Sequence, residues 1–235
     1  METTTQVLSI RLIQLGRQSK APDGEMSVFD ERSFDENFYR LVDEGHGEKA
    51  EELLLKAYSE LKAANNVRDF EYVVSRLALF YSLPDTENLA KAEAYFLESE
   101  SLAPGADSKR RTALFYFDVL QDFQKTVRKV DEISPVQADR DSYYSALTLK
   151  GQALIKLEMP GDAGRVIEEL LSMIKTNPGG LPYGDEINLL EAAVSSPILA
   201  PRCREVLELI IPKIRSQEYR ERAKALLKPG ELAVD

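Results

Sequence analysis

The chain has 235 residues and a formal net charge of -10, and hydrophobic residues make up 43% of it. This apolar fraction is enough to build a packed core, so the sequence is not that of a disordered chain. An acidic chain repels phosphate backbones, which argues against nucleic-acid binding.

Residues 1–28 form an apolar segment followed by a polar linker. The stretch VLSIRLIQL is apolar at both helical and alternating spacing, so helix and strand both stay open for it. No basic region precedes this stretch and Arg11 interrupts it, which argues against a secretory signal. No apolar run reaches the roughly 18 residues that a membrane span needs, so no membrane insertion is expected. Cys203 is the only cysteine, which favours a reducing compartment, and a cytoplasmic location is the expectation.

Residues 29–235 show the periodicity of helices. Apolar residues recur three and four apart over residues 34–42, 47–66, 69–83, 87–103, 142–158 and 162–175. Proline and glycine mark the breaks between these runs, and Ser33 with Glu36 predicts a capping box at the first helix. No alternating strand pattern occurs, so the chain is predicted to be all-α. Because the loops are short, consecutive helices should pack antiparallel. The helix register of residues 110–133 stays open.

The only histidine, His46, lies in the stretch EGHGEKAEELLLKA. Without a second histidine or a cysteine nearby in the pattern, it does not form a typical zinc site. Gly45 supplies the backbone freedom of a tight turn, and His46 is expected near the N-cap of the next helix. We interpret this stretch as a hinge between two helices.

A repeated pattern runs through the chain. Leu77, Ala78 and Tyr81 are followed by Ala92 and Phe96 and closed by Pro104, and a second set has Gly151, Leu154, Ala163, Ile167 and Pro178. This pattern resembles the tetratricopeptide repeat, a helix–turn–helix unit of about 34 residues. In that resemblance small residues stand where the paired helices touch, such as Ala78 or Gly151 on one helix and Ala50, Ala92 or Ala163 on the other.

Equivalent positions in the second helices are Ala50, Ala92, Thr126, Ala163 and Cys203, at spacings of 42, 34, 37 and 40 residues. The resemblance implies a right-handed α-solenoid of about five antiparallel helix pairs over residues 29–214. Residues 216–228 would form a capping helix. The domain expected after residues 1–28 therefore covers residues 29–235. Longer repeats of the HEAT or armadillo type remain an alternative.

The first helices of such an array line a concave surface, the usual binding face. The residues expected there are Asp35, Tyr39, Tyr72, Ser75, Leu79, Arg111, Leu114, Thr148, Gln152 and Ile155. The alternative is that some of them belong to the core. The basic run Lys109–Arg111 at a helix start is unfavourable for the helix dipole, and it indicates either an acidic partner or a solvated turn.

Sequence motifs for catalysis are not found: the chain has no phosphate-binding loop, no HExxH zinc motif and no GxSxG nucleophile elbow. Glu51 and Glu52 are adjacent on a helix and point apart, unlike a catalytic pair. The prediction is a non-catalytic scaffold without a cofactor, which binds a peptide or helix segment of another protein.

The alternative function is self-assembly into a homo-oligomer. Residues 21–60 carry twelve acidic against four basic side chains, and residues 201–235 carry eight basic against six acidic ones. Ends of opposite charge favour head-to-tail association, and residues 1–28 would add a docking arm.

Overall fold

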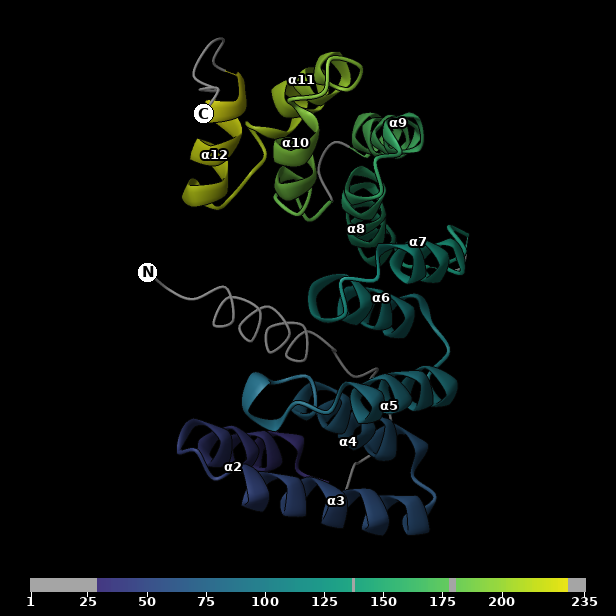
Figure 1. Cartoon of the computed structure of the whole chain (residues 1–235), viewed down its shortest axis with the longest axis vertical. Coiled ribbons are helices and arrows are strands. Elements are labelled where there is room, and N and C mark those ends of the chain that lie inside the picture. Colours follow the sequence, from purple (N-terminus) through teal and green to yellow (C-terminus); the bar gives the residue numbers. More distant parts are fainter. Residues whose placement is uncertain (1–28, 137, 178–180, 228–235) are drawn as a thin grey trace. The chain divides into compact units, whose positions relative to one another are not determined.

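The computed structural model describes residues 29–136, 138–177 and 181–227, and every element in these ranges is helical (Figure 1). The all-α prediction is confirmed for this part of the chain. The expected apolar segment of residues 1–28 and the repeat-closing Pro178 lie outside the described residues. None of the described helices is long and apolar enough to cross a membrane.

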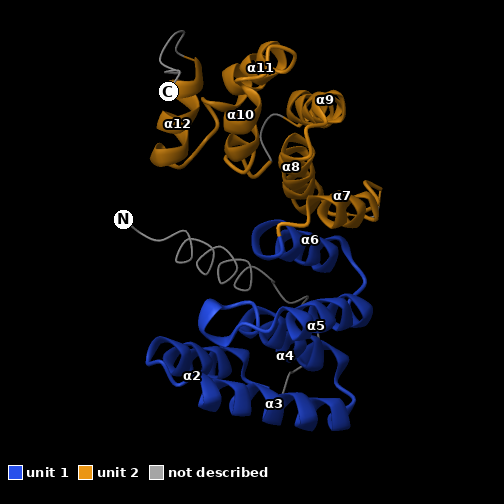
Figure 2. Cartoon of the chain, in the orientation of Figure 1, with its two compact units in different colours: residues 1–120 blue, residues 121–235 orange. Residues whose placement is uncertain are grey.

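The chain divides into two compact units, Met1–Leu120 and Gln121–Asp235 (Figure 2). In unit 1, helix α3 packs on both α2 and α4, and α5 packs on both α4 and α6. Its elements are α2 (Glu31–Asp43), α3 (Gly47–Ala64), α4 (Val67–Phe80), η1 (Pro84–Thr86), α5 (Leu89–Leu102), α6 (Ala106–Leu114) and η2 (Phe115–Val119).

In unit 2, helix α8 contacts α7, α9 and α10, while α12 rests on α10 and α11. Its elements are α7 (Phe123–Asp131), α8 (Arg140–Lys156), α9 (Pro160–Thr176), α10 (Ile187–Ala193), α11 (Ala200–Ile210) and α12 (Gln217–Leu227). Each unit has its own apolar core, built on Phe38, Leu54 and Leu77 in unit 1 and on Ile167, Leu190 and Leu207 in unit 2.

Short polar side chains start most of the longer helices. Asn66, Asn88 and Asp139 each accept a backbone N–H in the first turn of the helix that they cap. The predicted capping box at Ser33 is wrong by three residues, because Asp30 is the N-cap of α2 and accepts the N–H of Ser33 at 3.1 Å. Glu36 instead pairs with Arg32 on the helix surface.

The register of residues 110–133 is set by a wide turn. After α6 the backbone forms the π-helical turn η2, in which the N–H of Leu120 donates to the carbonyl of Phe115 at 3.1 Å. Gln121 then takes a left-handed conformation with φ of 51°, and Asp122 caps α7. The extra residue of a π turn breaks the three-and-four spacing, which is why the periodicity alone did not fix this register.

Every second helix from α3 to α11 carries a small, fully buried residue at the same point. Each is the fourth residue of its helix and is 0% exposed: Ala50, Ala92, Thr126, Ala163 and Cys203. The backbone N–H of each donates to the carbonyl of the residue that precedes the helix. These five positions are therefore equivalent in local structure.

Gly151 lies at a close approach between α8 and α10. A Cβ added there would come within 2.7 Å of Leu189 Cδ2 and 2.9 Å of Leu189 Cδ1. The resemblance to tetratricopeptide repeats predicts that this small residue contacts the second helix of its own pair, whereas the three atoms nearest to the added Cβ belong to Leu189 of α10. Leu189 is 0% exposed, so its side chain has little room to move aside.

We expect Gly151→Val to lower the free energy of unfolding by about 1–3 kcal/mol through overpacking against Leu189. The matched control is Gly161→Val in α9, where an added Cβ meets nothing within 4 Å. Urea unfolding followed by circular dichroism measures both. Equal stability of the two variants would contradict the close contact.

Candidate functional site

Asp35 and Tyr72, two of the predicted groove residues, are joined by a buried arginine. Arg76 of α4 donates to Asp35 of α2 through two bonds, Nε to Oδ1 at 2.9 Å and Nη2 to Oδ2 at 2.8 Å. The same Nη2 lies 2.9 Å from the hydroxyl of Tyr72. The Arg76 side chain is 2% exposed and that of Asp35 is 21% exposed, so this pair fastens α2 to α4.

The surroundings of Asp35, Tyr72 and Arg76 determine which of these side chains are charged. Burial raises the pKa of the Tyr72 phenol, which keeps the hydroxyl neutral. Burial by itself lowers the pKa of Arg76, but the hydrogen bond to Asp35 and the electrostatic contributions of Tyr39, Tyr72 and Asp35 together outweigh burial, and the net pKa is raised. Asp35 is consequently a structural ion-pair partner, with its charge already matched inside the protein.

Tyr39 and Leu79 line a common cavity at the opposite end of the same two helices. This hollow, of about 340 Å³, lies between the end of α2, the turn before α3 and the loop after α4. A second hollow of about 520 Å³ adjoins it and shares Gly45, Gly47, Phe80, Asp85 and Thr86 with it. We call the two together the hinge cavity.

Local backbone geometry explains why the cavity forms here. Gly45 has φ of 74°, which lets the chain reverse after α2, and the N–H of His46 donates to the carbonyl of Leu41 at 2.8 Å. Across the cavity, the loop that contains η1 is closed by the N–H of Asn88, which donates to the carbonyl of Tyr81 at 2.9 Å. The hinge interpretation of His46 agrees with its place as the exposed N-cap of α3.

The lining of the hinge cavity combines apolar and acidic side chains. Its apolar wall is made of Phe38, Tyr39, Val42, Leu79, Phe80, Leu83 and Pro84. Four carboxylates, of Asp43, Glu48, Glu51 and Asp85, lie around it against one basic side chain, Lys49. A ligand that carries large aliphatic groups beside positive charges matches this lining.

One of the four carboxylates belongs to a polar cluster with two side chains of unit 1. The hydroxyl of Tyr81 donates to Glu51, and Lys91 Nζ lies 3.1 Å from that hydroxyl and 3.4 Å from Glu51 Oε1. The hydrogen bond from Tyr81 lowers the pKa of Glu51, and burial raises the pKa of Tyr81. Glu51 therefore stays ionised, while the Tyr81 phenol stays protonated and is a poor nucleophile.

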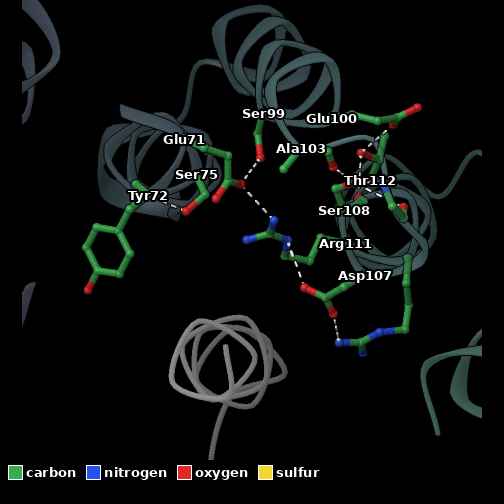
Figure 3. A network of polar contacts seen from close by, with 12 residues as sticks. Glu71, Tyr72, Ser75, Ser99, Glu100, Ala103, Asp107, Ser108, Arg111 and Thr112 are labelled. Atoms are coloured by element: carbon green, nitrogen blue, oxygen red, sulfur yellow. Dashed lines mark hydrogen bonds and ion pairs between the residues drawn. The ribbon is translucent and has the colours of Figure 1, made fainter. Parts of the chain in front are cut away.

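The predicted groove residues of α6 lie apart from the hinge cavity. Arg111 donates to Glu71 Oε1 at 2.8 Å, and Ser99 of α5 donates to the same oxygen at 2.6 Å (Figure 3). Asp107 approaches Arg111 at 3.5 Å and Arg110 at 2.8 Å. Neighbouring carboxylates thus neutralise the charges of Arg110 and Arg111 at the start of α6. Leu114 is half-buried near the end of this helix.

Ser75 and Thr148 are buried and do not face a binding surface. Ser75 is 6% exposed and its hydroxyl donates to the carbonyl of Tyr72 at 2.7 Å within α4 (Figure 3). Thr148 is 3% exposed and donates to the carbonyl of Ser145 within α8. In a buried helix, the hydroxyl groups of serine and threonine can form their hydrogen bonds with backbone carbonyls of the same helix. The polar residue type of Ser75 and Thr148 therefore did not mean that they are exposed.

The remaining two predicted groove residues, Gln152 and Ile155, also belong to α8 of unit 2. The Gln152 amide donates to the carbonyl of Thr148 at 3.3 Å, and Ile155 packs on the apolar core of its own unit. The hinge cavity therefore brings together Tyr39 and Leu79 alone among the ten predicted residues.

Most of the cavity wall was absent from the predicted groove, including Phe38, Val42 and Phe80 and the loop residues Leu83, Pro84, Asp85 and Thr86. Pro84, Asp85 and Thr86 were interpreted only as a break between helices. A usable signal was present, because the turns after α2 and after α4 are both rich in acidic residues and fall at corresponding points of successive helix pairs.

The ionisable groups of the described residues include no cluster of three or more histidine, cysteine or acidic side chains that would hold a metal ion. Cys203 is fully buried, and burial raises the pKa of its thiol to about 11, so it is not an activated thiolate.

Comparison of the chain with models of protein families, with curated proteins and with solved structures finds no match.

Proposed function

We propose that this protein is a non-catalytic scaffold that binds a segment of another protein in the hinge cavity of unit 1. The observation that carries the proposal is the lining of the cavity, with eight apolar or aromatic side chains and four carboxylates against Lys49. Glu51 is paired with Lys91, so three of the carboxylates remain to attract a basic ligand. The proposed ligand is a short peptide with large aliphatic side chains next to lysine or arginine. Anchors of this kind give most of the affinity in peptide recognition.

The tetratricopeptide-like character of the chain is part of the same proposal. The equivalent small residues at the fourth position of α3, α5, α7, α9 and α11 support a repeated helix pair. Arrays of helix pairs commonly act as binding scaffolds. The site of this chain lies at the turns of its first two pairs.

The alternative of head-to-tail self-assembly has less support, because basic side chains near the carboxy terminus are used inside unit 2. Arg222 pairs with Glu191 at 2.6 Å and donates to Asn188 at 2.8 Å. Lys224 pairs with Glu221 on the same helix. Charges that are already matched contribute little to attraction between molecules.

The test uses a phage-displayed library of random 12-residue peptides, selected on the full-length protein. We expect selected peptides to combine two large aliphatic residues with at least one lysine or arginine. Their dissociation constants, measured by isothermal titration calorimetry, should fall in the micromolar range, on the order of 1–100 μM. Failure to select such peptides would count against the proposal.

Charge reversal at the cavity should weaken the binding of these peptides, whereas charge reversal elsewhere on α3 should not. Asp43→Lys with Asp85→Lys is expected to reduce affinity about tenfold or more, because each nearby carboxylate contributes on the order of 1 kcal/mol. The control, Glu52→Lys with Glu60→Lys, makes the same change of net charge at exposed positions of α3 outside the cavity lining. Equal losses in both variants would mean that net charge alone attracts the peptides.

A further inference from the structure

We infer that the hinge cavity has a ligand within its own chain: residues 6–20 of the protein dock there and compete with the partner. This inference rests on the proposed function, since it assigns to the same cavity an internal occupant of the same chemistry. The cavity, the point where the chain enters unit 1, and the composition of residues 6–20 carry it independently of one another.

The chain enters unit 1 along the surface that leads to the cavity. Phe29, the first described residue, stacks on Phe34 of α2 with ring centroids 5.0 Å apart and meets Tyr72 of α4 at 6.1 Å. Leu79 follows Tyr72 by two helical turns on the same helix, and residues seven apart share a face of a helix. Phe29 therefore lies on the α2–α4 surface at whose other end the cavity opens.

The composition of residues 6–20 complements the cavity lining. The sequence QVLSIRLIQLGRQSK contains six aliphatic residues, three basic residues and no acidic one. The cavity offers an apolar wall with the carboxylates of Asp43, Glu48 and Asp85 against Lys49, while Glu51 is paired with Lys91. Opposite charges next to complementary apolar groups favour association, and the acidic lining would repel an acidic ligand.

The linker is long enough for docking within one molecule. Residues 21–28 lie between Lys20 and Phe29. Eight extended residues span up to about 27 Å. Tyr39 and Val42 follow Phe34 by five and eight residues, which is only about 8–12 Å along α2. No second copy of the chain is needed to fill the cavity.

Linkage makes even a weak internal ligand effective. A segment joined to its binding site by a short linker has an effective concentration in the millimolar range. If the free segment binds with a dissociation constant near 100 μM, the internal copy lowers the apparent affinity of a partner about tenfold. The segment thus sets the affinity threshold that a partner must exceed.

The test measures binding of a fluorescein-labelled peptide with the sequence of residues 6–20 to three full-length proteins by fluorescence anisotropy. These are the wild type, a segment variant and a polar control with the same number of substitutions, neither of which changes the net charge. The segment variant replaces three leucines, Leu8→Asn, Leu12→Asn and Leu15→Asn. The polar control replaces three polar residues of the same stretch, Ser9→Asn, Gln14→Asn and Gln18→Asn.

We expect the segment variant to bind the labelled peptide at least tenfold more tightly than the wild type and the polar control, because its own segment no longer competes. Adding Leu79→Asp to the segment variant should abolish this gain, whereas adding Leu97→Asp, at an exposed leucine of α5, should not. Circular dichroism of each variant verifies that its helices remain folded. In addition, hydrogen exchange of residues 36–43 and 79–86 should be faster in the segment variant than in the wild type.

Three outcomes overturn the inference. They are equal peptide affinity of all three proteins, no binding by any of them, and light scattering that shows a wild-type dimer which the segment variant dissociates. The dimer would mean that the segment docks on a second copy. If library-selected peptides bind the cavity while the residue 6–20 peptide does not, only the internal ligand fails and the proposed function stands. If only the residue 6–20 peptide binds, the internal ligand stands and the proposed function fails.

Discussion

Arg76→Met is expected to lower the free energy of unfolding of unit 1 by about 3 kcal/mol, within the range of 3–5 kcal/mol typical of broken buried ion pairs. The change removes both bonds to Asp35 and the bond to the Tyr72 hydroxyl, and it leaves the carboxylate without the guanidinium. Because Asp35 keeps 21% of its side-chain exposure, water recovers part of the loss, which places the value at the lower end. Urea unfolding followed by circular dichroism measures the effect.

The control is Arg32→Met, which breaks the exposed i,i+4 pair with Glu36 on the same unit. With 90% and 68% of the two side chains exposed, that pair contributes less than about 0.5 kcal/mol. A second change, Asp35→Asn in the Arg76→Met protein, should recover at least about 1 kcal/mol by removing the unpaired charge. Additive losses at Asp35 and Arg76 would contradict the coupling inferred from their geometry.

Glu186→Gln is expected to change how the stability of unit 2 depends on pH. Glu186 is 0% exposed, and burial raises the pKa of its carboxyl group to about 7, although the backbone N–H of Gly184 donates to it at 2.9 Å. Tyr144, also 0% exposed, lies beside it. The folded state therefore binds a proton at pH values where the unfolded chain has already lost it.

The sign follows from proton linkage. Between the ordinary glutamate pKa and pH 7 the folded protein holds more protons than the unfolded one, so the free energy of unfolding falls as the pH rises. The whole effect is about 3 kcal/mol, at 1.36 kcal/mol per pKa unit. It is fully present as stability below the ordinary pKa and is lost above about pH 7.

Glutamine stays neutral throughout, so the wild type minus variant difference in stability should fall between pH 5 and pH 8 by about 2–3 kcal/mol. Urea unfolding at a series of pH values measures this difference. Glu208→Gln, an exposed glutamate of α11, is the control and should give a flat difference. A flat difference for Glu186→Gln as well would contradict the raised pKa.

Much of the helical architecture could be predicted from the sequence, because three-and-four spacing and proline or glycine breaks are local properties. The helix boundaries that were predicted incorrectly are those at which more than one nearby residue could begin or end the helix. Asp30 and Ser33 both suit an N-cap by residue type, and in the structure α2 begins at Glu31 with Asp30 as its cap. The π turn before Leu120 has no signature in the apolar spacing, so the third helix pair stayed open.

The candidate site was less predictable, since its members come from turns that the sequence separates by about forty residues. Tyr39 and Leu79 were assigned to a binding face from their position on a first helix, and they do line the hinge cavity. Asp85 and Pro84 were missed because their role depends on how the loop after α4 faces the turn at Gly45. The burial of Ser75 was not evident either, because an internal hydrogen bond satisfies its hydroxyl.

The five buried residues at the fourth helix position have a consequence for how such chains diverge. Alanine, threonine and cysteine all occur there, so packing constrains the volume of the side chain and leaves its chemical identity free. Mutation can therefore replace these residues repeatedly as long as the side chain at the fourth position stays small. The spacing between these positions also varies, from 34 to 42 residues. Helix pairs of this kind are therefore better recognised by a small buried residue at the fourth position than by residue identity or by a fixed period.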